Sequence, residues 1–422
     1  MDKKQDFHIC GGKPLQGSIN ISGGKNAALG IIAGSTMAKG TVFLENVPLV
    51  EDILVACEIL RELGASVDLS DNGTLVIDAT HVTSRPIPDR LADRMRASYY
   101  FCAALLGRFG EGIVSLPGGC AIGQRPLDQT IKGLEALGAT VTIEYGTLCA
   151  RAEKLRGAEI FMDCVSVGAT VNTMIAAALA QGNTTIFNAA KEPHIVDVAN
   201  FLTSMGARIR GAGTAIIRIV GVGSLRGTSY AVVPDQIETG TMMIAAAATR
   251  GDVLVQGVIP VHMEALSAKL LEAGVSVKEE HNALRITATQ RPKAVNVTTL
   301  PYPGFPTDLQ QPMGTLLTTA TGTSVINETI FEQRFNYLHE LSRMGARSKV
   351  VDKVALITGV ESLRPARVNV PDLRAGAALV IAGLMAEGET VIGNAYYIDR
   401  GYERLAEKLC SLGADVWRGT TD

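Results

Sequence analysis

The stretch DILVACEILRELGASVDLS, residues 52–70, carries the pattern that decides the fold. Its apolar residues recur every three or four positions from Ile53 to Leu63, as in an amphipathic helix. Asp52 is an expected N-cap, and Gly64 suits the left-handed residue that ends such a helix. The alternating SVDLS that follows is typical of a strand. The stretch therefore predicts a helix, a glycine stop and a strand in succession.

The phrase around this glycine recurs along the whole chain of 422 residues. LGAS and its variants LGAT, MGAR, AGVS and LGAD begin at Leu63, Leu137, Met205, Ala273, Met344 and Leu412, at intervals of 74, 68, 68, 71 and 68 residues. A fixed period of this length is the mark of a repeat architecture. Six units of about 70 residues account for the chain.

A second phrase recurs out of phase with the first. Ala-rich segments are followed by a glycine and a β-rich run, as in AAALAQGNTTIFNAA at residues 176–190. These segments lack a polar face, which predicts helices buried on all sides. Each unit then holds two helices and several strands, which argues against a propeller. One unit cannot bury its own apolar face, so the units must associate. The period leaves open one ring of six or two groups of three.

The composition excludes several classes of protein. Lys and Arg number 39 against 42 Asp and Glu, for a net charge of −3, and aromatics are 5%, so we expect no nucleic-acid partner. Seven cysteines without a CxxC pair predict free thiols in a reducing cytoplasm. We expect no signal peptide and no membrane span, because the apolar runs are shorter than the ~20 residues that a span needs.

Common nucleotide-binding, hydrolase and metal-binding motifs are absent from the sequence. GAGTAI at 211–216 lacks the third glycine of a dinucleotide fingerprint, and GGKN at 23–26 lacks the spacing of a phosphate loop. No GxSxG occurs, and the six histidines are scattered, so a Ser-His-Asp hydrolase has no support. No cluster of His, Cys and carboxylates predicts a metal site.

Two segments place a cation at the head of an Ala-rich helix. SGGKNAAL brings Lys25 and Asn26 to the helix start, where unpaired amides favour an anion. The alternative is a solvated lysine at a helix end. ADRMRAS brings Arg94 and Arg96 toward the second Ala-rich helix, and the alternative there is a surface arginine.

The segment LPGGCAIGQRP at 116–126 is the most suggestive of catalysis. Cys120 lies among glycines that let a backbone approach a ligand, and Arg125 follows it. A nearby cation lowers the pKa of a thiol and favours its reactivity. The alternative is an inert thiol, as we expect for the other six cysteines.

The later repeats add a carboxylate and three arginines. Asp308 in PGFPTDLQQP is either a helix cap or a general base. Arg334, Arg374 and Arg400 would singly be surface charges. Lys25, Asp308 and Arg374 all fall at the heads of Ala-rich helices. If these heads converge, they form a pocket of several cations for a phosphorylated substrate.

These segments resemble one family over essentially the whole chain. The sequence is similar to the UDP-N-acetylglucosamine 1-carboxyvinyltransferases, of the EPSP synthase superfamily, in the stretches SGGKNAAL, MRAS, SLPGGCAIGQRPLD, VSVGAT, EPHIVD, PDQIETG, FPTDLQ, FEQRF, LSRMGA, DLRAG and IDRGYERL. The related shikimate-pathway transferases share the repeat but not the cysteine segment. Cys164 and Thr130 stand where some members have lysine and histidine.

The resemblance implies an α/β fold, a two-domain inside-out α/β barrel with six βαβαββ repeats, three per domain, and buried helices. It implies one domain of residues 1–22 and 233–422 and a second of residues 23–232, with a crossover at SYAVVPDQ. The substrate site would lie in the cleft, at the N-termini of the buried helices.

The resemblance also implies an activity. Such an enzyme moves the enolpyruvyl group of phosphoenolpyruvate to the 3-hydroxyl of UDP-N-acetylglucosamine and releases phosphate by addition and elimination. This step commits the sugar to peptidoglycan synthesis, and so to cell-wall biogenesis, cell shape and division. Alternatives are a transferase acting on shikimate 3-phosphate and a catalytically silent paralogue that binds nucleotide sugars. No metal and no redox cofactor are implied.

The resemblance assigns roles residue by residue. Cys120 would donate a proton to phosphoenolpyruvate and form a covalent adduct there, and fosfomycin would alkylate it. Asp308 would be the base, and Lys25, Arg125 and Arg400 a phosphate clamp, which makes Cys120, Asp308, Lys25 and Arg400 the catalytic set. The implied substrate contacts are Lys25, Asn26, Arg96, Arg125, Pro126, Leu127, Asp128, Gln129, Ser166, Val167, Asp308, Ile330, Arg334, Arg374 and Arg400.

Overall fold

The computed structural model describes residues 5–116 and 126–420, which form two compact units. One unit contains residues 5–22 and 234–420, and the other contains residues 23–116 and 126–233. Each unit has its own apolar core, and the two cores share no residue. The six repeats are therefore divided into two groups of three.

Among the described residues, six sheets follow one strand plan, three in each unit. A short edge strand runs parallel to the second strand, and two antiparallel strands complete the sheet. In the unit of residues 23–233 the sheets are β15–β4–β6–β5 (Ser229–Ala231, Thr41–Glu45, Leu75–Asp78, Ser66–Leu69), β7–β9–β8 (Glu111–Ser115, Thr147–Arg151, Thr140–Glu144) and β10–β11–β13–β12 (Glu159–Phe161, Asn183–Phe187, Ile216–Val220, Arg208–Arg210). In the second of these, an isolated parallel bridge from Ile87 to Val114 replaces the edge strand. A ribbon of β3 (Ala38–Lys39) and β14 (Leu225–Arg226) is added.

The other unit repeats the plan with strands from both ends of the chain. Its sheets are β2–β16–β18–β17 (Gln16–Asn20, Asp252–Gln256, Ala283–Thr287, Ser276–Glu279), β19–β20–β22–β21 (Val297–Thr298, Thr323–Asn327, Val354–Thr358, Arg347–Val351) and β23–β24–β1–β25 (Arg367–Asn369, Gly388–Gly393, Asp6–Gly11, Asp415–Gly419). The N-terminal strand β1 pairs with both β24 and β25, with Ile9 opposite Thr390 and Val416. This pairing ties residues 5–22 to the C-terminal half of the chain.

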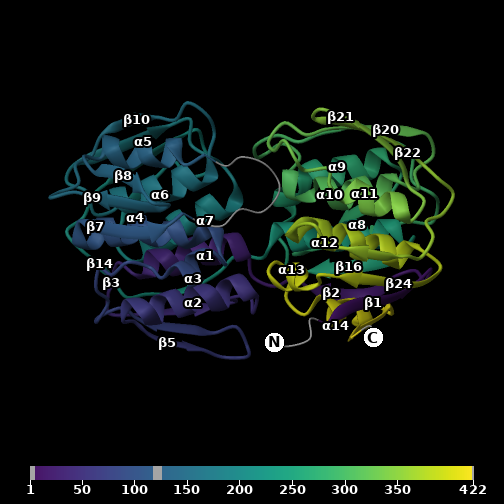
Figure 1. The fold of residues 1–422 in the computed structure, drawn as a ribbon, viewed down its shortest axis with the longest axis horizontal. Coiled ribbons are helices and arrows are strands. Elements are labelled where there is room, and N and C mark those ends of the chain that lie inside the picture. The colour runs from purple at the N-terminus through teal and green to yellow at the C-terminus, as the bar shows by residue number, and fades with distance from the viewer. Residues whose placement is uncertain (1–4, 117–125, 421–422) are drawn as a thin grey trace. The chain divides into compact units, whose positions relative to one another are not determined.

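The Ala-rich helices are buried, as the sequence predicts. They are α1 (Lys25–Ser35), α4 (Tyr99–Phe109), α6 (Val167–Ala177), α8 (Gln236–Ala248), α10 (Gln310–Leu317) and α12 (Leu373–Met385). Figure 1 shows α1, α4 and α6 in the middle of their unit with strands around them. Small residues permit this packing: a Cβ on Gly30 would lie 2.6 Å from Cγ2 of Val198 in α7 (Pro193–Ser204).

The second helix of each repeat is partly exposed and ends at the recurrent glycine. These helices are α2 (Glu51–Leu63), α5 (Asp128–Ala136), α7 (Pro193–Ser204), α9 (Glu264–Glu272), α11 (Tyr337–Arg343) and α14 (Leu405–Ser411). The six glycines, at 64, 138, 206, 274, 345 and 413, have φ between 87° and 109°. Only glycine adopts this conformation without strain. A strand follows each of them, so this part of the prediction is confirmed.

One local prediction is wrong. The helix α2 begins at Glu51 with Val50 as its N-cap, so Asp52 does not cap it. The carboxylate of Asp52 instead binds Lys25 of α1. A contact with a distant residue has taken the side chain that local preference assigns to the cap.

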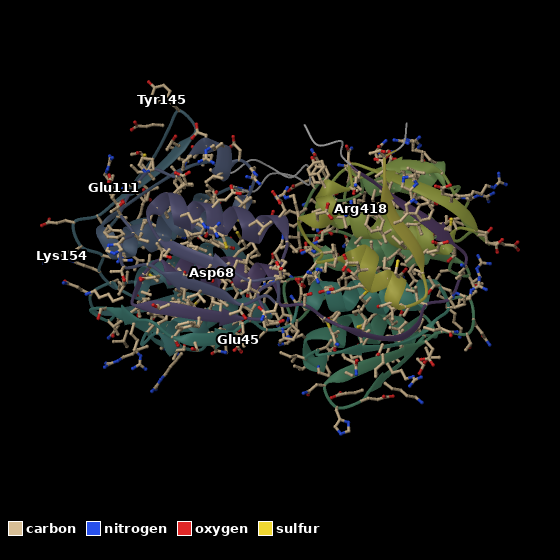
Figure 2. All side chains as sticks on the ribbon, turned by 90° about the horizontal axis from the view of Figure 1, so that it is seen from below. Glu45, Asp68, Glu111, Tyr145, Lys154 and Arg418 are labelled. Carbon is tan, nitrogen blue, oxygen red and sulfur yellow. The ribbon has the colours of Figure 1, made fainter. Side chains whose placement is uncertain are left out.

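The outer faces of the sheets are mixed: exposed polar side chains such as those of Glu45 and Asp68 lie there (Figure 2), and so do exposed apolar ones such as those of Phe43 and Phe161. Tyr145 is fully exposed in the turn between β8 and β9. Within residues 5–116 and 126–420, no helix combines the length and the apolar character that crossing a bilayer requires.

A buried carboxylate anchors the chain at Ser22, where it leaves its unit. Oε2 of Glu238 accepts a hydrogen bond of 3.0 Å from the amide of Ser22, and Lys408 pairs with Oε1. Lys408 Nζ also donates a hydrogen bond of 2.7 Å to Ser22 Oγ, and this hydroxyl donates a hydrogen bond to Oε2 of Glu403. Burial raises the pKa of Glu238 from 4.5 to about 7, although Lys408 opposes this shift and Asp235 adds to it.

The raised pKa of Glu238 predicts a pH dependence of stability. Between pH 4.5 and about 7 the folded chain binds a proton here that the unfolded chain has lost, so stability falls as pH rises through this window. We expect Glu238→Gln to remove on the order of 2 kcal/mol of that fall. Urea unfolding at pH 5 and pH 8 measures it. An equal loss in the variant and in the parent would contradict the prediction.

Candidate active site

Lys25 is buried at the first position of α1 and is not a solvated residue. Its Nζ lies 2.9 Å from Oδ2 of Asp52, and the two side chains are only 8% and 5% exposed. A buried lysine and carboxylate neutralise each other and fix each other in place. Asn26 follows Lys25 in the same turn. The ion pair with Asp52 therefore holds the ammonium group of Lys25 at the start of the buried helix α1.

Arg94 and Arg96 differ in their surroundings. Arg94 pairs on the surface with Glu58 at 3.1 Å and with Glu51, so the surface interpretation holds for it. Arg96 is half-buried and opens the short helix η1 (Arg96–Ser98), which leads directly into α4. The sequence prediction that Arg96 approaches the head of a buried helix is confirmed.

A polar cluster links the start of α5 to the segment before α6. Gln129 donates from Nε2 to Asp128 at 2.9 Å and to Asp163 at 3.1 Å, and it accepts from the amide of Asp163 at 2.8 Å. Lys132 donates to Asp163 at 2.6 Å and, with Gln129, lowers the pKa of that carboxyl. Sequence reasoning missed Asp163 and Lys132, because neither stands in a recognisable motif.

The other predicted contacts of this unit flank the cluster. Pro126 and Leu127 precede α5. Ser166 caps α6, accepting from the amide of Ala169 at 3.3 Å, and Val167 is the first residue of that helix. At Cys164, burial and then the carboxylates of Asp128 and Asp163 raise the thiol pKa. Cys164 is therefore a poor candidate for a reactive thiolate.

Asp308 joins two buried arginines from later in the chain. It lies in η3 (Thr307–Leu309), which leads into α10. Its Oδ1 lies 2.6 Å from Arg334 Nη2, and its Oδ2 lies 2.9 Å from Nη2 and 3.0 Å from Nε of Arg374. The arginine side chains are 1% and 7% exposed, and that of Asp308 is 26% exposed. Asp308 makes no side-chain cap, so its interpretation as a helix cap is wrong.

Arg374 is held in its charged form by its neighbours. Burial by itself lowers the pKa of Arg374, but Asp308, followed by Tyr402 and Asp235, outweighs this effect and raises it. The Tyr402 ring lies 5.6 Å from the guanidinium carbon, and its hydroxyl lies 2.9 Å from Oγ1 of Thr241. Two buried donors, Nε of Arg334 and Nη1 of Arg374, have no partner among the described residues.

A second carboxylate, that of Asp372, connects the segments that carry Arg334 and Arg374. Asp372 caps α12 through the amides of Arg374 and Ala375, at 3.0 and 3.1 Å. Gln311 Nε2 donates to Asp372 at 3.0 Å and to the carbonyl of Arg334 at 3.1 Å. Sequence reasoning missed both residues. An aspartate directly before a buried helix was the available signal for Asp372.

The remaining predicted residues are placed as follows. Arg400 is half-buried and directly follows α13 (Tyr396–Asp399), and Ile330 is half-buried beyond the end of β20. Cys120 and Arg125 lie outside the described residues. Some of the described predicted residues thus lie at or near the starts of buried helices, namely Lys25, Asn26, Arg96, Ser166, Val167, Asp308 and Arg374. The others lie at the start of α5 (Pro126, Leu127, Asp128 and Gln129) or in segments after β20 and α13 (Ile330, Arg334 and Arg400).

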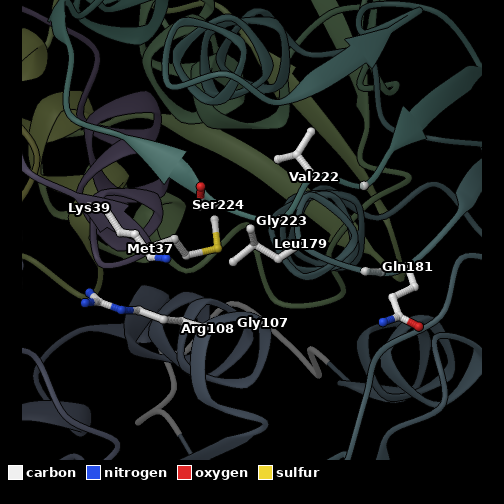
Figure 3. A pocket seen from close by; sticks show the side chains of 11 residues that line it. Met37, Lys39, Gly107, Arg108, Leu179, Gln181, Val222, Gly223 and Ser224 are labelled. Atoms are coloured by element: carbon white, nitrogen blue, oxygen red, sulfur yellow. The ribbon is translucent and has the colours of Figure 1, made fainter.

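A cavity of about 400 Å³ lies elsewhere, in the unit of residues 23–233 (Figure 3). Met37, Gly107 and Leu179 line it, at the C-terminal ends of α1, α4 and α6. Helix C-termini carry the negative end of the helix dipole and disfavour anions. In keeping with this, Arg108 there donates to the carbonyls of Thr36 and Ala79 at 2.6 and 2.9 Å. None of the predicted site residues lines the cavity.

Comparison with known proteins decides the family. The sequence model of the EPSP synthase family, 3-phosphoshikimate 1-carboxyvinyltransferase, matches residues 9–409. The chain belongs to this family. UDP-N-acetylglucosamine 1-carboxyvinyltransferase 3 of Caldanaerobacter subterraneus subsp. tengcongensis is 53% identical over 414 residues, which cover 98% of this chain and 99% of the relative. UDP-N-acetylglucosamine 1-carboxyvinyltransferase of Clostridium botulinum is also 53% identical, over 97% of this chain and 99% of the relative.

Solved structures share the fold of this chain. The enolpyruvyl transferase NikO from Streptomyces tendae superposes with a TM-score of 0.89 at 26% identity, over the whole of both chains. EPSP synthase from Acinetobacter baumannii superposes with a TM-score of 0.75 at 19% identity, over 98% of this chain and 99% of the other, and shares the fold. The family and the fold class that the sequence predicts are confirmed.

Proposed function

We propose that this protein transfers the enolpyruvyl group of phosphoenolpyruvate to the 3-hydroxyl of UDP-N-acetylglucosamine and releases phosphate. The observation that carries the proposal is 53% identity over nearly the whole chain to relatives named for this transfer. The residues present agree with it, because each unit by itself holds buried cations, Lys25 in one and Arg334 and Arg374 in the other, and both proposed substrates are anionic. The reaction would serve peptidoglycan synthesis in the cytoplasm, where the described cysteines, all free, would remain reduced.

The mechanism we propose proceeds by addition and elimination. Asp308 accepts the proton of the sugar 3-hydroxyl while the oxygen of that hydroxyl attacks C2 of phosphoenolpyruvate. Cys120 donates a proton to the methylene carbon of phosphoenolpyruvate. The tetrahedral intermediate then loses a proton from that carbon and expels phosphate. Lys25, Arg125 and Arg400 would hold the phosphate, which supplies orientation and charge stabilisation. We also propose that the two units are the two domains of the enzyme, with boundaries near residues 22 and 233.

Phosphate release tests the proposed function. We expect release from phosphoenolpyruvate with UDP-N-acetylglucosamine, and none with shikimate 3-phosphate or without an acceptor. Cys120→Ala should abolish release, because general acid catalysis contributes about 10²–10⁴-fold. Fosfomycin should inactivate the parent in a time-dependent way by alkylating Cys120. Release with shikimate 3-phosphate would overturn the substrate assignment. If no phosphate is released with either UDP-N-acetylglucosamine or shikimate 3-phosphate as the acceptor, a silent paralogue would be favoured.

A further inference from the structure

Glu328 is a fully buried carboxylate directly after β20 that the proposed mechanism does not use. Its Oε1 accepts hydrogen bonds from Thr299 Oγ1 at 2.9 Å and from the amides of Ile330 and Phe331 at 2.9 and 3.1 Å. Its Oε2 accepts from Thr307 Oγ1 at 2.9 Å. Among the described residues, no Lys or Arg side chain donates a hydrogen bond to this carboxylate.

The four donors belong to segments that meet at the candidate site. Thr307 directly precedes Asp308 in η3. Ile330 is a predicted substrate contact, and the segment that begins there continues to Arg334, which binds Asp308. Thr299 joins the same segment, since its Oγ1 accepts from the amide of Thr329 at 3.0 Å. One side chain thus connects the candidate base to a candidate substrate contact.

The burial of Glu328 needs a reason beyond packing. A buried carboxylate is costly unless its oxygens are hydrogen-bonded. An apolar residue of similar size would fill the space but would leave these four donors without an acceptor. What the carboxylate adds is geometry: two oxygens at a fixed separation hold two backbone segments in one arrangement. Reaction sites depend on such support, because small displacements of reacting groups slow chemistry strongly.

We propose that Glu328 is a positioning residue for the acceptor sugar. Through Thr307 it fixes the turn that carries Asp308, and through the amides at 330 and 331 it fixes the segment that carries the predicted substrate contact Ile330. The 3-hydroxyl then faces the base while the sugar lies along Ile330. The inference rests on the proposed function.

Thr307→Val tests the link to the base, because it removes only one of the four hydrogen bonds to Glu328. We expect kcat for phosphate release to fall about tenfold, while KM for UDP-N-acetylglucosamine stays within about twofold. Glu328→Gln should also raise that KM, because it disturbs the segment at Ile330. The matched control is Thr323→Val on β20, whose exposed hydroxyl lies 3.3 Å from Thr358 Oγ1. It should leave both parameters unchanged.

Thr307→Ser separates positioning from packing. Serine restores the hydroxyl without the methyl group, so kcat should return to near the parental value. Parental kcat in Thr307→Val, or a loss that serine does not rescue, would overturn the proposal. If valine prevents folding, Thr307→Ala provides the same comparison with serine. Absence of release by the parent with UDP-N-acetylglucosamine would instead count against the proposed function.

Discussion

Asp308→Asn is expected to lower kcat for phosphate release by about 10³-fold, within the range of general base catalysis. Asparagine keeps the shape of the side chain but has no carboxylate to accept the proton of the sugar hydroxyl. It also leaves two buried guanidinium groups, those of Arg334 and Arg374, without the anion between them. Steady-state assays with both substrates near saturation measure kcat.

Asp252→Asn is the matched control for this prediction. Asp252 is also held by an arginine, with Arg285 Nε and Nη2 at 2.9 and 2.8 Å, but the pair lies on an exposed sheet face. Its loss should leave kcat unchanged. A decrease of less than threefold in Asp308→Asn, or an equal decrease in both variants, would contradict a role as the base.

Lys25→Met is expected to abolish activity and to destabilise the fold by about 3 kcal/mol, because breaking a buried ion pair leaves a charge in a poor environment. Asp52 is only 5% exposed, so water cannot replace the lysine. Urea unfolding measures the stability, and phosphate release measures the activity.

The double variant Lys25→Met, Asp52→Leu separates these two effects. An apolar pair of similar volume should restore the stability to within about 1 kcal/mol of the parent. Activity should stay lost, because no cation remains at the head of α1. Recovery of activity in the double variant would show that Lys25 acts only as a partner of Asp52.

The repeats could be predicted from the sequence because their signals are local. The glycine at 64 and its five counterparts end helices through their own backbone conformation. The Ala-rich helices are buried because they have no polar face to expose. Asp52 shows the limit of such reasoning, since a preference for the cap position could not foresee a lysine on another helix.

The candidate residues were found by residue type, but their partners were not. Asp308 meets arginines that are 26 and 66 residues away along the chain. Nothing in the intervening sequence encodes that contact. Glu328 went unnoticed because a buried glutamate after a strand resembles a surface residue until its four donors are known.

The sequence by itself determined the six repeats, the identity of the buried helices and the types of residue at their heads, because backbone conformation and apolar periodicity act over a few residues. Only the tertiary structure decided which strands share a sheet, as β1 does with β24 and β25, and which charges share a site. These depend on contacts between residues far apart in the chain. Such contacts form when several repeats bury their apolar faces together.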